Sequence, residues 1–198
     1  LSTLVVFPTV YWVHLRLPQL RPVIEFFTAL PFVIPGVVLT FGLLRTYSGP
    51  PFALTNTEGG TIFLLVCGYT VTALPYTFRA IDTGMRAIDV RTLTEAARNL
   101  GASWVTVIIR VILPNLRTAV LAAAFLTFAI AIGEYSLSVF LFPDERAFGP
   151  YIAAITRRQP YQPAALTIIS FIMVWFFVTL IQWSGRGSSD RVQMTGGR

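Results

Sequence analysis

Residue types that commonly carry out chemistry are scarce in this chain of 198 residues. It has one histidine, His14, and one cysteine, Cys67, which gives neither a Cys/His cluster with metal-ligand spacing nor a Ser-His-Asp triad. All 15 basic residues are arginine. The absence of lysine excludes a Walker A phosphate loop, which needs a lysine on the transferred phosphates. We therefore expect no catalytic residues, no metal ligands and no cofactor bound by this chain itself.

One polar segment has a pattern that predicts a defined shape. Asp89 can cap a helix, because its carboxylate can accept hydrogen bonds from the first backbone N–H groups. Gly101 stands where a residue in the left-handed conformation would end that helix. Ser103 can cap a second helix from Trp104 to about Leu113, and Pro114 then begins the return toward the membrane. Apolar residues of the first helix recur at steps of three and four and predict one apolar stripe: Val90, Leu93, Ala97 and Leu100.

Two interpretations of this segment are open. Ala96 and Ala97 keep one side of the helix slim, which would let another protein surface approach closely. Alternatively, the helix lies on lipid headgroups with Arg91 and Arg98 against anionic lipid. Composition alone favours the lipid-surface helix, because a basic amphipathic helix most simply lies on a membrane.

The elements that would position this segment are strongly apolar. Hydrophobic residues make up 55% of the chain, the mean hydropathy is +0.68 and 12% of the residues are charged. A soluble domain carries about 25% charged residues, so the deficit indicates a bilayer protein. The net charge of +6 does not indicate nucleic acid, because the arginines lie between apolar runs and not in an aromatic-interleaved basic patch. We predict an all-α, polytopic membrane helix bundle that forms a single domain over residues 1–198.

About five spanning helices are predicted. Residues 1–13 reach only about 20 Å where a hydrocarbon core needs about 30 Å, so we interpret them as the end of a span that begins outside this sequence. The polar segment, at about 79–118, lies between the third and fourth spans, and a Gly/Ser/Arg tail at about 185–198 is expected to be disordered at its end. The complete spans are predicted at 24–44, 61–78, 118–141 and 164–183, with loops at 45–60 and 142–163.

Two prolines interrupt the second span. Pro31 and Pro35 stand four residues apart, and Gly36 follows. Each proline removes a backbone donor and clashes with the preceding turn, so we expect this helix to bend or break. A break within a bilayer is tolerated where protein or water satisfies the freed carbonyls, so we expect this helix to face the bundle interior near Pro35 and to line a pathway. An ordinary proline kink without a pathway role is the alternative.

The fourth span carries a small-residue stripe and an acid. Glu134, followed by Tyr135, is the carboxylate that the sequence places well inside a span. Pairing with an arginine or a backbone group, or a role in the pathway, would each offset its burial, and both are open. The candidate pathway residues are therefore Pro35, Gly36, Glu134 and Tyr135. Four-residue steps of small side chains favour close helix packing over contact with a solute: Ala119, Ala123, Thr127 and Ala131.

The arginines are distributed unequally along the chain. Eleven of the 15 fall before residue 24, within 79–117 or after residue 183, and four fall in the remaining segments. The positive-inside rule then places the polar segment and the C-terminus in the cytoplasm, with the other two loops outside.

The polar segment also resembles a known motif. Glu95-Ala96-Ala97, then Gly101, then Val111-Ile112-Leu113-Pro114 is similar to the signature loop of the inner-membrane permease subunits of binding-protein-dependent, type I ATP-binding-cassette (ABC) importers. Val111 stands where that pattern usually has isoleucine, which is a conservative change. In that family the loop forms a cytoplasmic coupling helix that docks in a cleft of the ATPase subunit. The resemblance implies that Glu95, Ala96, Ala97 and Gly101 contact the ATPase and that Pro114 belongs to the frame of the loop. We predict that Arg98 and Leu100 also contact the ATPase, and that Asp89 and Leu113 also belong to the frame.

The resemblance implies a non-catalytic subunit that forms the solute pathway of an importer in the bacterial inner membrane. ATP and magnesium would bind to a partner ATPase dimer, a second permease subunit would complete the pathway, and an extracytoplasmic solute-binding protein would deliver the solute. The runs Gly133-Glu134-Tyr135 and Phe148-Gly149-Pro150-Tyr151 are similar to permeases of the polyamine, ferric-iron and thiamine group. A polyamine or another small cation would suit Glu134.

Two other classes of protein compete with this interpretation. A secondary transporter driven by an ion gradient should show intramembrane ion ligands and an internal repeat, whereas this sequence shows one carboxylate in a span and no repeat. A membrane-anchored interaction protein would not need kinked interior helices. Co-purification of an ATPase subunit would separate the importer from both.

Overall fold

The computed structural model describes residues 1–141, 147–158 and 161–193, and within them it contains helices and no strand. This confirms the predicted all-α fold. Two 3₁₀ turns, η1 (Pro18–Leu20) and η2 (Leu54–Asn56), and a π-helical segment, η3 (Val107–Ile112), lie between the α-helices. The α-helices are α1 (Ser2–Arg16), α2 (Arg21–Val33), α3 (Gly36–Tyr47), α4 (Glu58–Ala87), α5 (Val90–Asn99), α6 (Trp104–Thr106), α7 (Leu113–Asn115), α8 (Arg117–Gly133), α9 (Ser136–Leu141), α10 (Phe148–Arg158) and α11 (Tyr161–Gln193).

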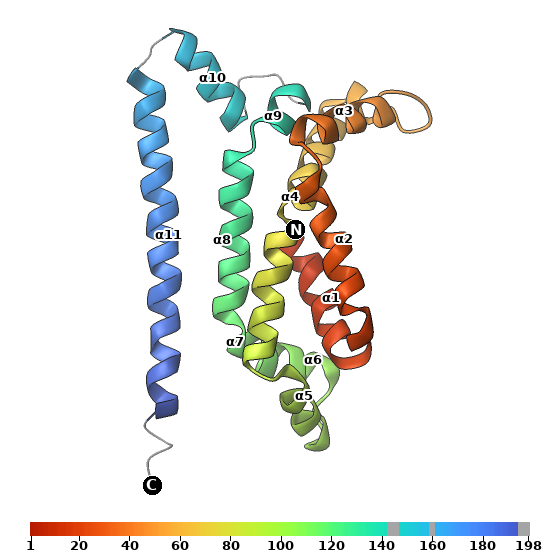
Figure 1. Cartoon of the computed structure of the whole chain (residues 1–198), viewed down its shortest axis with the longest axis vertical. Helices are drawn as coiled ribbons and strands as arrows, with labels where there is room; N and C mark the ends of the chain where they lie inside the picture. The colour runs from red at the N-terminus through yellow and green to blue at the C-terminus, as the bar shows by residue number, and fades with distance from the viewer. Residues whose placement is uncertain (142–146, 159–160, 194–198) are drawn as a thin grey trace.

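The long helices run roughly side by side (Figure 1). Helices α1, α2, α4 and α8 form the bundle, α5, α6 and α7 lie at one end of it, and α3, α9 and α10 lie at the other. We call these the α5 end and the α3 end. Helix α11 runs along the outer side of α8, where the ring of Phe177 stacks on Phe125 with centroids 4.6 Å apart.

Among the described residues, α4 and the first 20 residues of α11 are each long and apolar enough to cross a membrane. Two further spans are possible if each bent pair of helices is one crossing: 18–33 with 36–47, bent by 95°, and 104–115 with 117–133, bent by 76°. Helix α1, with 15 residues, is shorter than a span, as residues 1–13 were predicted to be. The structure thus gives two to four spans and one short apolar helix.

Several predicted boundaries are wrong. Helix α4 continues through Ala87 and not to residue 78, because its polar side chains after Arg79 find partners within the bundle. The predicted span at 118–141 is broken at 134–135, and the predicted loop at 142–163 contains α10. Helix α11 extends to Gln193 where a tail was expected from about residue 185. Residues 142–146 and 159–160 of that predicted loop lie outside the described residues.

The predicted break in the second span is confirmed. Helix α2 ends at Val33, and Pro35 starts α3 with an extended backbone (φ −56°, ψ 135°), because proline has no N–H to continue the helical ladder. Pro31 is accommodated inside α2. The expected interior position of Pro35 is wrong for the described chain, since its side chain is exposed, whereas Gly36 is half-buried against α9.

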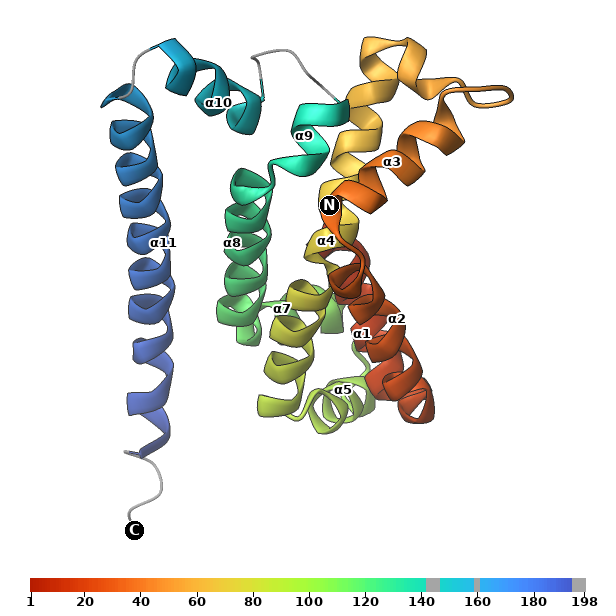
Figure 2. The ribbon, with the colours of Figure 1, turned by 45° about the horizontal axis from the view of Figure 1, so that its top comes forward.

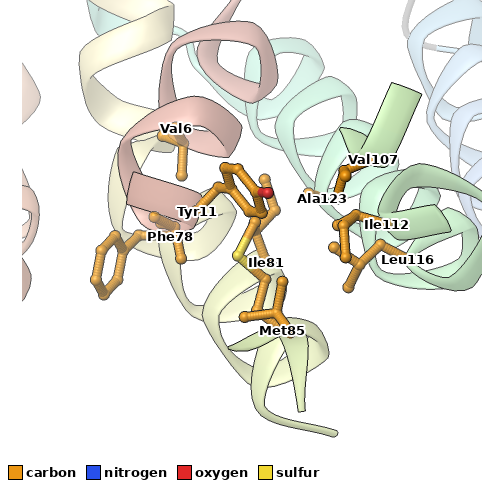
Figure 3. Packing of buried hydrophobic residues seen from close by; sticks show 11 residues of the cluster. Val6, Tyr11, Phe78, Ile81, Met85, Val107, Ile112, Leu116 and Ala123 are labelled. Atoms are coloured by element: carbon orange, nitrogen blue, oxygen red, sulfur yellow. The ribbon is translucent and has the colours of Figure 1, made fainter. Parts of the chain in front are cut away.

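The main core lies toward the α5 end. It is built from the inward faces of α1, α4, η3 and α8, and Figure 3 shows these side chains converging. Helix α4 supplies the largest buried side chains, and η3 and α8 close the core from the other side. The fully buried members include Val10, Phe78, Ile81, Met85, Val107, Ile112, Leu116 and Ala123.

The small-residue stripe of α8 packs against α4. A methyl group built on Gly84 would overlap the methyl of Ala119, and Ala123 is fully buried. The packing interpretation of this stripe is therefore confirmed. Because lipid tails do not drive helices together, such close approach through small residues is what holds helices together in a bilayer.

Hydroxyl groups join the same helices deeper in the bundle. Thr127 Oγ1 lies 3.1 Å from Ser2 Oγ of α1 and 3.0 Å from Thr77 Oγ1 of α4. Ser2 and Thr77 are buried. The Thr127 hydroxyl therefore links three helices through two buried partners.

Replacing Thr127 with valine is expected to lower the free energy of unfolding by about 1 kcal/mol, the usual size of an interhelical hydrogen bond in a membrane. Thr70→Val is the matched control, because the exposed Thr70 hydroxyl bonds only within α4, to the Val66 carbonyl at 2.7 Å. Thermal unfolding of both variants in detergent measures the difference. Equal loss of stability in the two variants would contradict the structural role of Thr127.

Candidate functional site

The polar segment folds as predicted in outline and lies at the α5 end of the bundle (Figure 2). Helix α5 turns one face inward: Val90 and Thr94 are buried, and Leu93 and Ala97 pack against the core. Thr94 Oγ1 also lies 3.3 Å from the hydroxyl of Tyr11 in α1. Helix α5 is therefore fixed to its own bundle along its apolar face.

Asp89 stands at the start of α5 but does not cap it as predicted. Its backbone is left-handed (φ 45°), and its carboxylate accepts a hydrogen bond from Thr92 Oγ1 at 2.7 Å and none from the backbone of α5. A capping residue normally has an extended backbone, and the left-handed turn removes the carboxylate from the first N–H groups. Asp89 instead makes the sharp corner between α4 and α5.

Gly101 ends α5 as predicted. It has φ +82°, its N–H donates to the carbonyl of Arg98 at 2.9 Å, and the N–H of Ala102 donates to the carbonyl of Ala97 at 3.1 Å. This pair of bonds is a Schellman motif, in which a left-handed residue satisfies the last carbonyls of a helix. The N–H of Thr106 then donates to Ser103 Oγ at 3.2 Å, which confirms the predicted cap of the second helix.

The second helix differs from the prediction at its end. After α6 the backbone widens into η3, where the N–H of Leu113 donates to the carbonyl of Ile108. Pro114 lies inside the following turn, α7, and the chain bends at Leu116, before α8. Because Pro114 has no N–H, the carbonyl four residues earlier loses its helical donor, which accounts for the widened segment. The return of the chain therefore begins at Leu116 and not at Pro114.

The outward face of α5 is polar and open. Glu95, Ala96, Arg98 and Gly101 are exposed, and Arg91 Nε donates to Glu95 Oε1 at 2.9 Å in an ion pair on the surface. Leu100 was predicted to belong to the inward stripe, but 89% of its surface is exposed. The helix ends at Asn99, so Leu100 leaves the helical period and points outward.

Arg98 turns back toward its own chain. Its guanidinium lies 4.8 Å from the ring centroid of Trp104, and Nη1 donates to the carbonyl of Ala102 at 3.4 Å. It lines a polar hollow beside the end of α1 together with Arg16, Arg91 and Glu95. The Arg98 side chain therefore contacts the residues that follow Gly101 in its own chain, and these contacts support the Gly101 corner.

Of the four candidate pathway residues, Gly36 and Glu134 lie against each other, whereas Pro35 and Tyr135 do not share that contact. Glu134 Oε1 accepts from the N–H groups of Ser136 and Leu137 at 3.0 and 3.2 Å, and a methyl built on Gly36 would lie 3.2 Å from the same oxygen. The break between α2 and α3 therefore lies against the turn between α8 and α9. Pro35 and Tyr135 are exposed on the described chain. The pairing of Glu134 with backbone groups, one of the two open interpretations, is confirmed.

A family model settles what kind of protein this is. The model described as the binding-protein-dependent transport system inner membrane component matches residues 18–193. The chain belongs to this permease family. Its spans and family together make it a multi-pass inner-membrane protein.

Individual relatives of this permease agree. It is 35% identical over 147 residues to a Haloferax volcanii protein named as a probable molybdenum ABC transporter permease, covering 71% of this chain and 54% of the relative. It is 31% identical over 137 residues to the molybdenum transport system permease of Azotobacter vinelandii, with coverages of 66% and 60%. It is 30% identical over 165 residues to the ferric transport system permease of Actinobacillus pleuropneumoniae, with coverages of 80% and 23%. The chain spans about a fifth to about half of the length of the first relatives it matches.

The permease has a buried carboxylate in α4, Asp82, which sequence reasoning missed. Asp82 lies in α4 with 4% of its side chain exposed, and it pairs with Arg21, Arg86 and His14. The prediction ended the span at residue 78 because Arg79 follows, so Asp82 was assigned to the polar segment. The spacing of Asp82 and Arg86, one helical turn apart, was the available signal.

Proposed function

We propose that this chain forms part of the translocation pathway of an ABC importer and couples it to ATP hydrolysis by a separate cytoplasmic ATPase subunit. The observation that carries the proposal is the arrangement of α5. Its apolar face packs on its own bundle through Val90 and Thr94, which leaves an open polar face at the α5 end. A helix lying on lipid would need an apolar face free for the acyl boundary. This arrangement favours a protein contact over the lipid-surface interpretation.

The contact proposed for the ATPase uses the exposed part of α5 and its corner. Glu95, Ala96 and Leu100 present a charge, a slim surface and an apolar side chain to the partner, and Gly101 fixes their direction. Ala97 and Arg98 support this contact face from within their own chain, because Ala97 packs on the core and the Arg98 guanidinium lies over the Trp104 ring. The frame residues are Asp89 at the first corner, with Leu113 and Pro114 in the turn before α8.

The coupling proposed here is a rigid-body movement. Two ATPase subunits closing on ATP would displace α5, and its buried contacts would pass that displacement to α1, α4 and α8. ATP and magnesium bind to the ATPase dimer, so this chain needs no cofactor and is not itself an enzyme. A second permease subunit, identical or different, completes the pathway.

The orientation proposed follows from the arginine distribution. The α5 end and the C-terminus face the cytoplasm, and the α3 end faces the solute-binding protein. Residues 1–198 then form one permease domain with its coupling segment at about 79–118. No nucleic-acid partner is proposed.

The pathway is proposed to pass the point where the α2–α3 break lies against the turn between α8 and α9, near Gly36 and Glu134, with Pro35 and Tyr135 at its edge. The Glu134 carboxylate accepts two backbone N–H groups on one oxygen, which fixes it at the turn between α8 and α9. Relatives are named for ferric, molybdenum, 2-aminoethylphosphonate and sulfate transport, and these names do not support a polyamine. We therefore propose a small inorganic ion or oxyanion as the solute.

Replacing Glu95 with lysine is expected to reduce the amount of ATPase recovered with the tagged permease by about tenfold, because it reverses the charge on the contact face and breaks the pair with Arg91. Gln19→Lys is the control, since it adds positive charge at an exposed position outside that face. Affinity purification from native membranes measures recovery. Recovery of an ATPase with parent and Glu95→Lys alike would refute the contact, and recovery with neither would favour a secondary transporter or an interaction protein.

A further inference from the structure

A buried carboxylate joins three helices just above α5. Asp82 Oδ1 lies 2.9 Å from His14 Nε2 and 3.0 Å from Arg21 Nε, and Asp82 Oδ2 lies 2.9 Å from Arg21 Nη2. Arg86 Nη2 donates to the same Oδ2. We call Asp82, His14, Arg21 and Arg86 the Asp82 clamp.

The clamp connects elements that the chain order separates. His14 is in the last turn of α1, Arg21 begins α2, and Asp82 lies in α4. Helices α1 and α2 are joined only by the short η1 turn, so they form a hairpin whose tip is held against α4. Arg21 makes two parallel hydrogen bonds to the carboxylate, which fixes direction as well as distance.

The same hairpin touches the coupling segment directly. The Tyr11 hydroxyl lies 3.3 Å from Thr94 Oγ1 of α5, and the Tyr11 and Trp12 rings each lie 6.5 Å from the ring of Trp104 in α6. These are one long hydrogen bond and two ring contacts, one edge-on and one tilted. The charged clamp is the stronger link, because the Asp82 side chain is only 4% exposed and its carboxylate would be left buried without a partner if the paired groups were lost.

The hairpin also leads to the proposed pathway. Helix α2 runs from Arg21 to Val33, directly before the break at Pro35, and Gly36 then lies against Glu134. A displacement of the hairpin tip therefore reaches the break between α2 and α3 along one rigid helix. Helix α1 also packs in one apolar core with α4 and α5 through Val10 and Tyr11, so the clamp adds a charged, directional bond at the hairpin tip to that apolar contact.

We infer that Asp82 is a positioning residue that clamps the α1–α2 hairpin to α4, so that a displacement of α5 also moves the α2–α3 break. This inference rests on the proposed coupling function for the direction of the movement, although the clamp itself does not. Asp82 acts through the hairpin and contacts neither solute nor ATPase.

The test uses the full chain in nanodiscs, with Cys67→Ala and spin labels at pairs of exposed positions. Labels at Gln19 and Thr83 report the distance from the hairpin tip to α4, and labels at Thr83 and Asn99 report the distance from α4 to α5. In the parent we expect a narrow distribution for both pairs. In Asp82→Asn we expect the Gln19–Thr83 distribution to broaden and the Thr83–Asn99 distribution to stay unchanged.

Two further variants keep the test decisive. Arg21→Gln removes the bond to α2 and leaves Asp82 with His14 and Arg86, so it should broaden the same distribution even if Asp82→Asn does not fold. Glu25→Gln is the matched control, because Glu25 pairs with the same Arg21 nitrogen at 3.8 Å but lies on α2 itself and joins no second helix. A Gln19–Thr83 distribution in folded Asp82→Asn or Arg21→Gln that is as narrow as in the parent would overturn the inference.

A second arm adds the co-purifying ATPase and traps it with MgATP and orthovanadate. We expect the Gln19–Thr83 distance to stay fixed on trapping in the parent and in Glu25→Gln, and to shift in Asp82→Asn, because α4 then moves without the hairpin. A shift in the parent as large as in the variant would overturn the inference. Absence of any response to trapping in every variant, with the broadening still present in the first arm, would instead refute the proposed coupling and leave the clamp intact.

Discussion

Alanine at Gly84 is expected to destabilise the bundle by about 1–3 kcal/mol, the usual cost of inserting a methyl group into a closely packed site. A methyl at this position overlaps the methyl of Ala119 and lies 3.0 Å from a methyl of Leu116. Helices α4 and α8 would have to separate where the core is otherwise closed. Thermal unfolding of the purified chain in detergent measures the change.

Two variants control this experiment. Gly42→Ala makes the same substitution in α3, where a new methyl meets nothing within 4 Å, so it should leave stability unchanged or raise it slightly. The double variant Gly84→Ala/Ala119→Gly lacks the overlapping methyl of Ala119, so it should regain most of the stability that Gly84→Ala alone loses. If Gly84→Ala is as stable as Gly42→Ala, or if the double variant gives no recovery, the close approach of α4 and α8 is wrong.

The small residues that make this contact show how far sequence reasoning reached. The stripe from Ala119 to Ala131 predicted close packing because small residues recur at helical spacing in one segment. The partner of Ala119 could not be predicted, since nothing local says that Gly84 lies opposite. The continuation of helix α4 past residue 78 could not be predicted either, because Asp82 is paired with Arg21, which lies in a different helix.

The sequence near Gly101 correctly predicted the corner after α5. It did not correctly predict the backbone at Asp89 or the exposure of Leu100. Gly101 and Ser103 act on backbone groups within a few residues, so their roles can be predicted from spacing. Asp89 adopts a left-handed backbone because α4 and α5 meet at a sharp angle, which is a tertiary constraint. Leu100 fits the apolar period but lies beyond the end of the helix, so its exposure depended on where Gly101 stops α5.

Position 101 is where we expect the largest effect on coupling. Valine there must hold φ near +82°, which costs an L residue about 1–2 kcal/mol and more with a branched Cβ. The Schellman bonds to Ala97 and Arg98 would loosen, and the face carrying Glu95 and Leu100 would lose its direction. We expect ATPase recovery with the tagged permease to fall by about tenfold, the change that about 1.4 kcal/mol produces.

The variant Gly101→Asn tells whether a loss of ATPase recovery comes from the changed backbone geometry or from the presence of any side chain at position 101. Asparagine tolerates the left-handed conformation, so Gly101→Asn should keep most of the ATPase recovery that Gly101→Val loses. Both variants put a side chain into open space, since a methyl on Gly101 meets nothing within 4 Å, so steric overlap within the chain cannot explain a difference between them. Equal recovery with Gly101→Val and the parent would show that the corner does not direct the contact face. Equal loss in Gly101→Asn and Gly101→Val, with both proteins folded in the membrane, would show that a partner surface approaches Gly101 itself too closely for any side chain.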